Sequence, residues 1–468
     1  MRTLLFIFLI ATSVSAQEMR LSKGVVMDSL PVNDTIRETY SLFLPQSFEN
    51  NGSPKPVIFL FDSEGRGRTA AQLFMTAAEE QDYILASSNN ISPNNTLEEN
   101  VNVAARLMHA VTTSIPVDFN RISVAGFGEG AKAATALPAV YQNIHGVIAI
   151  GDNQLILDYL DKNNKLFFVG VAGDEDIAAY GMRATAAQLE SMGFPVVVYI
   201  FDGGHEWPNP AIISAAMGSL TLQAMKSGKT GRQQQLINSL YQDDLGRVNQ
   251  LISTGDSFKA YNLMDILISK YDGLLNLSEL ESKQRQLSRT RNYSEQRKAA
   301  GEIQNKESRL IDDFIYYLNE DVGTANFENL GWWNFQKLEL EKLAGGENEL
   351  EADMGKRLLN FLDKISEMKR AEIAAAERTS LESQLLANMI QTIFDQNDFQ
   401  AYKKIISLSA QDDDYSTALF YLEEMLKNGY GELEPLYDIE GTLALRLTPE
   451  FNWLVKKYLG TSKFYDEQ

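Results

Sequence analysis

The chain contains no cysteine, and it has only three histidines. The absence of cysteine excludes disulfides, thiolate-bound zinc and cysteine nucleophiles. His109, His145 and His205 lie far apart in the sequence, and none has a second ligand type at the i, i+4 spacing of a helical metal site. We therefore expect neither a metal nor another cofactor. His109, within a predicted helix, and His145, beside a predicted strand, are expected to be structural.

Basic residues are scarce relative to acidic ones. The chain has 42 Lys and Arg against 63 Asp and Glu, which gives a formal net charge of −21. Binding to nucleic acid requires a cationic face that neutralises phosphates. Attraction to an anionic membrane surface requires the same sign of charge. We therefore expect no nucleic-acid partner.

Proline is missing from a long internal stretch. Ten of the 12 prolines lie at or before Pro210, and none lies between Pro210 and Pro435. Because proline interrupts helices but punctuates strands and loops, the change marks a boundary. We place the boundary in the linker Lys226–Gly231, which predicts one domain over residues 17–228 and an all-helical domain over residues 229–468.

The first residues have the pattern of a secretory signal peptide. Arg2 supplies a positive start, Leu4–Ile10 is apolar, and Ser13–Ala16 offers small residues before Gln17. This pattern predicts a signal peptide over residues 1–16 with cleavage after Ala16. The apolar run is shorter than the ~20 residues that a membrane-spanning helix needs. We expect an exported protein, periplasmic or secreted, without a membrane anchor.

The first half alternates between apolar strands and amphipathic helices. Apolar strands separated by such helices predict a mostly parallel sheet covered on both faces. The ligands of such sheets bind at the carboxyl ends of the strands. The predicted strands are Tyr40–Leu44, Pro56–Phe61, Tyr83–Ser87, Arg121–Ala125, Gly146–Ile150, Leu166–Val171 and Val196–Phe201, and the predicted helices are Thr69–Gln81, Leu97–Thr113, a helix from Glu129, Ala178–Met192 and Ile212–Met225.

The second half has apolar residues at helical spacing throughout, as at Leu358, Leu362 and Ile365. Glu281–Arg309 is poor in apolar residues and predicts a long exposed helix or a mobile connection. Near the C-terminus we expect a helix that ends at Gly429, a second over Leu433–Leu445 and a third after Pro449. These last helices loosely resemble tetratricopeptide pairs. A bundle and a degenerate helical repeat both fit the pattern.

The sequence Gly126-Phe127-Gly128-Glu129-Gly130 follows a predicted buried strand and precedes a predicted helix. This is the setting of the G-x-S-x-G nucleophile elbow, in which small residues flank the nucleophile because backbone atoms crowd there. Gly128 stands where the serine would be. The alternative is an ordinary glycine-rich turn between strand and helix.

Two later loops supply an acid and then a base, which is the order in which these residues follow a nucleophile elbow along the chain. Asp176 follows the strand Leu166–Val171, with Asp174 as a competing choice. His205 lies in Gly203–Pro208, after the last predicted strand. We expect His205 to be the base and Asp176 the acid that orients it.

An oxyanion hole would use the backbone N–H of Glu129 and a second N–H from the loop Asp62–Gly67, which contains Ser63. Without a hydroxyl at Gly128, acyl-enzyme chemistry by the usual route is excluded. The alternative nucleophiles are Ser63 and a water molecule in the space that the missing serine leaves at Gly128.

These motifs resemble the α/β-hydrolase superfamily, in particular its esterases, polyhydroxybutyrate depolymerases and dienelactone hydrolases, over about residues 40–225. The resemblance implies an α/β-hydrolase fold and hydrolysis of esters or related acyl bonds. The departure at Gly128 predicts a pseudo-hydrolase that binds an acyl or carboxylate ligand or a protein partner, the latter through the helical domain. One alternative is an active ester or acyl hydrolase that uses Ser63 or water, and another is a structural adaptor that acts through its helical domain.

Overall fold

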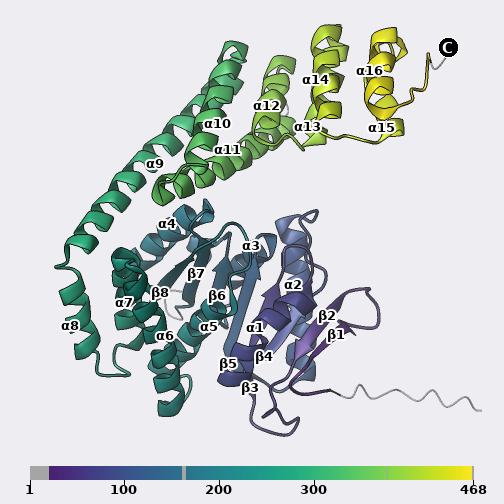
Figure 1. Ribbon diagram of the computed structural model, residues 1–468. Helices are drawn as coiled ribbons and strands as arrows, with labels where there is room; N and C mark the ends of the chain where they lie inside the picture. The colour runs from purple at the N-terminus through teal and green to yellow at the C-terminus, as the bar shows by residue number, and fades with distance from the viewer. Residues whose placement is uncertain (1–20, 161–164, 377, 466–468) are drawn as a thin grey trace, which may run out of the picture. The chain divides into compact units, whose positions relative to one another are not determined.

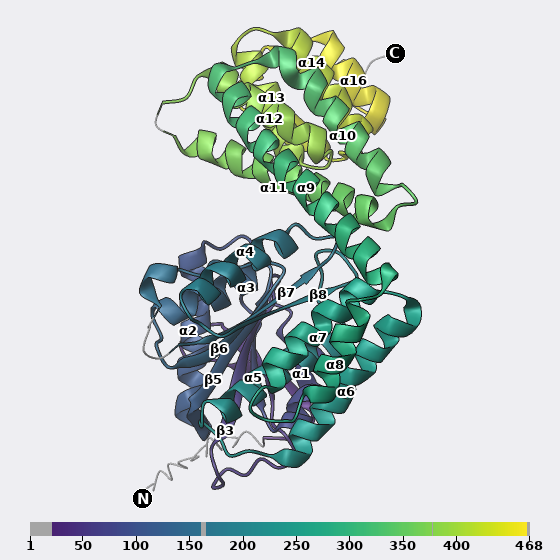
Figure 2. The same ribbon diagram turned by 90° about the vertical axis from the view of Figure 1, so that its left-hand side faces the viewer.

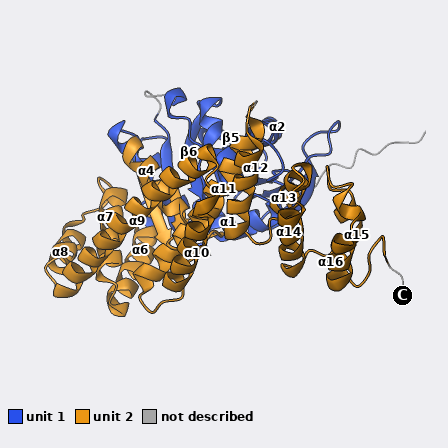
Figure 3. Cartoon of the chain, turned by 90° about the horizontal axis from the view of Figure 1, so that it is seen from above, with its two compact units in different colours: residues 1–169, 189–196, 209–236 blue, residues 170–188, 197–208, 237–468 orange. Residues whose placement is uncertain are grey.

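The computed structural model describes residues 21–160, 165–376 and 378–465 (Figure 1). The predicted signal peptide, residues 1–16, lies outside the described residues. The chain divides into two compact units, coloured separately in Figure 3. The first comprises the chain up to Val169 together with Leu189–Val196 and Asn209–Leu236; the second comprises Gly170–Gln188, Val197–Pro208 and the chain from Ile237 onward. The predicted boundary after residue 228 stays a prediction.

An eight-stranded sheet forms the centre of the first half, in the order β1-β2-β4-β3-β5-β6-β7-β8. β1 and β2 pair in antiparallel fashion, as do β2 and β4, whereas β4, β3, β5 and β6 are parallel. This confirms the predicted α/β-hydrolase type of sheet. The strands are β1 (Val26–Pro31), β2 (Thr39–Phe43), β3 (Lys55–Phe61), β4 (Ile84–Ser88), β5 (Val117–Phe127), β6 (Ile144–Ile150), β7 (Phe167–Gly173) and β8 (Val196–Phe201).

The parallel strands form because both of their faces are apolar. In β3, every residue after Lys55 is buried, which requires helices on both faces. α1 packs against α5, and α2 packs against α3; Figure 2 shows the two pairs on opposite faces of the sheet. The helices of this half are α1 (Gly67–Gln81), α2 (Leu97–Ser114), α3 (Glu129–Ala136), α4 (Ala178–Ser191) and α5 (Pro210–Lys226).

Local signals define where these helices begin. Thr96 and Glu99 form a reciprocal capping box at the start of α2, which satisfies two backbone donors that lack partners in the helix. At α5, the Asn209 side chain accepts from the backbone of Ala211 and Ile212, and Pro210 is the first helical residue. The fixed φ of proline suits that position.

The remainder of the chain is helical, as predicted. The stretch Glu281–Arg309 lies in helices α8 and α9 apart from a short turn at residues 288–290, so it is mainly helical. The helices are α6 (Gln234–Thr254), α7 (Ser257–Tyr271), α8 (Ser278–Leu287), α9 (Arg291–Thr324), α10 (Leu330–Ala344), α11 (Glu349–Ala375), α12 (Leu381–Phe394), α13 (Phe399–Gln411), α14 (Tyr415–Lys427), α15 (Leu433–Tyr437) and α16 (Pro449–Leu459).

Two element predictions fail for local reasons. The sequence did not predict β1, which has a single buried residue and is irregular: Ser29 has φ +57°, and the pairing shifts register between Met27 and Leu30. The predicted helix Leu433–Leu445 is wrong, because α15 ends at Tyr437. Gly441 follows with φ +77°, a conformation that an α-helix cannot contain.

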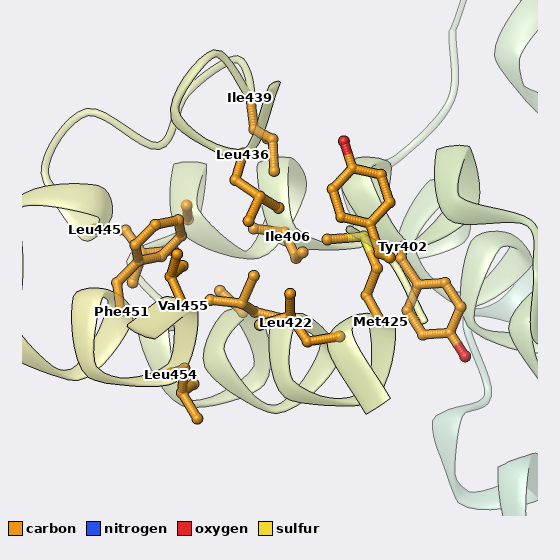
Figure 4. Packing of buried hydrophobic residues seen from close by; sticks show 14 of the residues in the cluster. Tyr402, Ile406, Leu422, Met425, Leu436, Ile439, Leu445, Phe451, Leu454 and Val455 are labelled. Carbon is orange, nitrogen blue, oxygen red and sulfur yellow. The ribbon is translucent and has the colours of Figure 1, made fainter. Parts of the chain in front are cut away.

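The helical region has its own apolar cores. Trp333 is 1% exposed within a cluster from α9 to α12, and its Nε1 donates to Asp321 Oδ2 at 2.9 Å. A second cluster joins α13 to α16 around Phe451 and Leu422, both fully buried (Figure 4). Such burial is what stabilises helices of this length in water. Among the described residues, no helix combines the length and apolar character required to cross a membrane.

His145, near the start of β6, is 3% exposed, and we expect it to make the protein less stable in acid. Burial, followed by the positive charge of Lys229, lowers its pKa from 6.5 to about 4, although the Asp118 charge opposes this effect. The unfolded chain therefore binds a proton that the folded chain does not, as the pH falls from 6.5 to 4. The free energy of unfolding should drop by about 3 kcal/mol across that range on account of this group.

Urea unfolding at pH 7 and at pH 4 tests this expectation. His145→Asn should lose that part of the pH dependence. His109→Asn is the matched control, because His109 is exposed on α2, and it should keep the wild-type pH dependence. An unchanged pH dependence in His145→Asn would contradict the assignment.

Candidate functional site

The turn between β5 and α3 has the geometry of a nucleophile elbow. Gly128 has φ +55° and ψ −124°, a backbone region that L side chains rarely adopt. A Cβ on Gly126 would lie 2.2 Å from the Gly130 carbonyl oxygen, and a Cβ on Gly130 would lie 2.1 Å from that of Phe61. The flanking glycines are therefore required by close backbone approach. At the apex, where this fold carries its nucleophile, there is no side chain.

The loop after β3 lies at the same edge of the sheet. Phe61 pairs with Gly126 in the parallel register, so Ser63 and Gly128 each lie two residues beyond paired positions. The loop is held by Asp62, which is fully buried. Its Oδ1 accepts from the backbone N–H groups of Glu64 and Arg66, at 2.9 and 3.2 Å. Ser63 is half-buried on a fixed loop.

Asp176 and His205 form a pair in the second unit. His205 Nδ1 lies 2.7 Å from Asp176 Oδ2. The Asp176 side chain is 3% exposed and that of His205 is 41% exposed. The other oxygen of Asp176 accepts from the backbone N–H of Ala178 at 2.9 Å. Because an ionised carboxylate can only accept, Nδ1 carries the proton, and Nε2 is the nitrogen that can take one up.

The loops that carry this pair are packed backbone to backbone. We call Gly173–Ile177 the acid loop and Asp202–Glu206 the base loop. A Cβ on Gly173 would lie 2.1 Å from the Gly203 carbonyl oxygen. The Glu175 N–H donates to the same oxygen at 3.0 Å. Asp174, the competing acid, accepts from the Gly203 N–H at 3.1 Å and pairs with Lys259, whereas the carboxylate beside His205 is that of Asp176.

Glu129, the predicted contributor to an oxyanion hole, is the first residue of α3. Backbone N–H groups in the first turn of a helix have no acceptor within the helix. The Glu129 side chain pairs with Lys132 Nζ at 2.5 Å, and Lys132 also lies 3.5 Å from Asp152. Burial alone would lower the pKa of Lys132, but the hydrogen bond to Glu129 and the charge of Asp152 raise this pKa overall. The carboxylate beside the elbow is thus partly neutralised.

The predicted site residues fall into two groups. Gly128, Glu129 and Ser63 lie in the first unit, and Asp176 and His205 lie in the second. Sequence reasoning missed Asp62, which anchors the Ser63 loop, and the helical residues that bind the acid loop, described below. Within residues 21–160, 165–376 and 378–465, no group of three or more His, Asp or Glu side chains is placed to hold a metal ion.

The second unit holds a histidine whose ring is oriented by a carboxylate. A carboxylate that fixes the imidazole tautomer is the arrangement by which serine hydrolases accept a proton from their nucleophile. The first unit has the strained turn that would present such a nucleophile. Gly128 has no atom from which a proton could be taken.

No family model and no curated protein matches this chain. Several solved structures resemble it over less than half of its length. A thermostable esterase is 14% identical with a TM-score of 0.35, over 43% of this chain and 62% of that one. An S-formylglutathione hydrolase from Staphylococcus aureus is 13% identical with a TM-score of 0.35, over 42% of this chain and 95% of that one.

A hyperthermophilic esterase from the archaeon Pyrobaculum calidifontis is similar at the same level. It is 14% identical with a TM-score of 0.36, over 43% of this chain and 87% of that one. The chain therefore spans less than two thirds of the thermostable esterase but most of the other two proteins. Likeness at this level does not identify an activity, and the fold rests on the strand order described above.

Proposed function

We propose that this is an exported pseudo-hydrolase: a protein of the α/β-hydrolase fold that binds an acyl or carboxylate ligand without forming an acyl-enzyme. The observation that supports the proposal most strongly is the contrast between Gly128 and the Asp176–His205 pair. The elbow turn is present with φ +55°, but its apex has no side chain. The acid and base remain hydrogen-bonded at 2.7 Å. Decay of an unused site would be expected to affect both.

The chemistry of the remaining groups favours a ligand with a carbonyl or carboxylate oxygen. The first turn of α3 presents backbone N–H groups and the positive end of its dipole. His205, in the second unit, can itself donate to such an oxygen when its imidazole is protonated. Absence of a hydroxyl at residue 128 leaves room for a ligand atom where an esterase has its own oxygen. The ligand would therefore be bound rather than cleaved.

Binding and turnover measured together test the proposal. The wild type should hydrolyse p-nitrophenyl acetate and butyrate no faster than buffer does. Acetate or butyrate should shift the His205 ring signals of 15N-histidine-labelled protein, and His205→Ala should weaken binding measured by calorimetry. His109→Ala should bind as the wild type does. Turnover well above background, or no binding of any short carboxylate at millimolar concentration, would refute the proposal.

An active hydrolase that uses Ser63 or water is the second candidate. The parallel register supports it, because Ser63 and Gly128 each lie two residues beyond the pair Phe61–Gly126. If it is correct, the wild type hydrolyses activated esters, and Ser63→Ala lowers the rate by about 10²-fold or more, as loss of a nucleophile does. On our proposal, Ser63→Ala leaves the rate at background.

A structural adaptor is the third candidate. It is favoured by large apolar side chains that lie exposed on α9 and α10, among them Tyr316 at 61% and Leu338 at 62%. An adaptor would retain its partner in a pull-down when His205 is replaced by alanine. On this candidate, the last helices, which loosely resemble tetratricopeptide pairs in sequence, would bind the protein partner.

A further inference from the structure

The acid loop is bound by three cationic side chains that come from the helical region. Lys259 lies on α7, and Lys356 and Arg357 lie on α11. All three belong to the same compact unit as the acid and base loops, shown in one colour in Figure 3. The sequence motifs that contain the elbow, the acid and the base include none of these residues.

Lys259 bridges the two loops that carry the acid and the base. Its Nζ lies 3.1 Å from Asp174 Oδ2 in the acid loop and 2.6 Å from Asp202 Oδ1 in the base loop. Burial alone would lower the pKa of Lys259, but the hydrogen bond to Asp202 and the charges of both aspartates raise it. The lysine therefore stays protonated and holds both carboxylates.

Arg357 and Lys356 bind the acid loop from α11. One guanidinium nitrogen of Arg357 donates to the backbone carbonyl of Asp174. The guanidinium is fixed by a bidentate pair with Glu307 of α9, at 2.7 and 2.8 Å. Lys356 Nζ pairs with Glu175 Oε1 at 2.6 Å. Arg357 is 14% exposed and Glu307 8%, so this pair is shielded from solvent while Lys356 is not.

The acid loop also makes an apolar contact with the helical region. Ile177, the residue after Asp176, packs against the buried cluster formed by α9 to α12, which includes Leu358 and Phe314. An isolated ion pair at a half-exposed surface contributes little, but Lys259 holds two carboxylates at once, one in each loop. A fixed guanidinium on a backbone carbonyl, combined with an adjacent buried apolar contact, restrains the loop more effectively.

We propose that Lys259, Lys356 and Arg357 are positioning residues that hold Asp176 against His205, so that the helical region is a working part of the site. This inference rests on the proposed role of the Asp176–His205 pair. Asp176 is two residues from the carbonyl that Arg357 binds, and the Asp174 N–H donates to Phe201 O at 2.8 Å. Arg357 therefore binds the acid loop at the residue that also joins it to β8, the strand that leads into the base loop.

Two sets of variants of the full chain test the inference. Lys259→Gln combined with Lys356→Gln removes two contacts whose side chains are 41% and 37% exposed. Arg357→Gln combined with Glu307→Gln removes the third without leaving a lone buried carboxylate. Arg370→Gln is the matched control: Arg370 also lies on α11 and also forms an ion pair, with Asp398 at 2.8 Å, but it lies about 20 Å along the helix from Arg357.

The decisive readout is the ring of His205 in 15N-histidine-labelled protein, assigned with His205→Gln. In the wild type and in Arg370→Gln, the ring should show a single tautomer with the proton on Nδ1. In the Lys259→Gln, Lys356→Gln variant and in the Arg357→Gln, Glu307→Gln variant, the ring should show averaging between the two tautomers. Amide hydrogen exchange in residues 173–177 and 202–206 should be at least tenfold faster, while exchange in β5 should not change.

Either double variant must first be shown to keep protected amides in α9–α12. If such a variant has the His205 signals and the exchange rates of the wild type, the inference is overturned. If the Arg357 variant loses that protection, the half-exposed Lys259 and Lys356 variant decides the question alone. The ring signature does not depend on turnover or on ligand. Failure of carboxylate binding would therefore refute the proposed function and leave this inference standing.

Discussion

Gly128→Ser is expected to convert the protein into an esterase. The hydroxyl would be presented by a turn that already has φ +55° and ψ −124°, and the second unit holds an imidazole that is oriented by Asp176. Positioned general-base catalysis contributes about 10²- to 10⁴-fold in rate. We therefore expect hydrolysis of p-nitrophenyl acetate at least about 100-fold above the wild type. The strained apex should cost about 1–3 kcal/mol of stability.

Removing the base from this variant supplies its control. Gly128→Ser combined with His205→Ala should return to the wild-type rate, because the hydroxyl is then not deprotonated. Full esterase activity is not expected, because Glu129 places a carboxylate beside the developing oxyanion; its pair with Lys132 offsets only part of that charge. A folded Gly128→Ser protein that stays at background with every acyl chain length would favour the adaptor.

Gly130→Ala is expected to destabilise the protein by about 3 kcal/mol or to prevent folding. The new Cβ would lie 2.1 Å from the Phe61 carbonyl oxygen and 2.5 Å from its carbon. Backbone atoms of a central strand cannot move aside as a flexible side chain can, so α3 would be displaced from β3. In the Gly128→Ser background, the same change should abolish ester hydrolysis. Urea unfolding measures the first effect.

Gly301→Ala provides the matched control for Gly130→Ala. Gly301 lies inside α9, and a Cβ there would meet nothing within 4 Å. Alanine is favoured over glycine within helices by up to about 1 kcal/mol, so this variant should be at least as stable as the wild type. Equal stability of the two variants would mean that α3 does not lie close to β3 as described.

The sequence predicted the α/β half well because its signals are local. A wholly apolar run such as Val57–Phe61 predicts a strand buried on both faces. The spacing Gly126-x-Gly128-x-Gly130 between a strand and a helix predicts a tight turn. The structure gives both a physical reason, in burial and in backbone approach. The order of Asp176 and His205 along the chain was sufficient to nominate the pair that lies at 2.7 Å.

What the sequence could not supply depends on contacts between distant segments. Arg357 binds the carbonyl of Asp174, 183 residues away, and no spacing rule connects these positions. β1 was missed because it is held by pairing with β2 rather than by its own apolar pattern. The predicted helix Leu433–Leu445 cannot run through Gly441, which adopts a positive φ; glycine permits this conformation, but its presence in a sequence does not require it.

Labelling by a fluorophosphonate probe tests the central claim, that the site keeps its acid and base but has no nucleophile. The wild type and Gly128→Ser are incubated with the probe, and their intact masses are compared. We predict an unchanged mass for the wild type and one adduct for Gly128→Ser, mapped to position 128 and lost when His205 is also replaced by alanine. An adduct on Ser63 of the wild type would contradict the account.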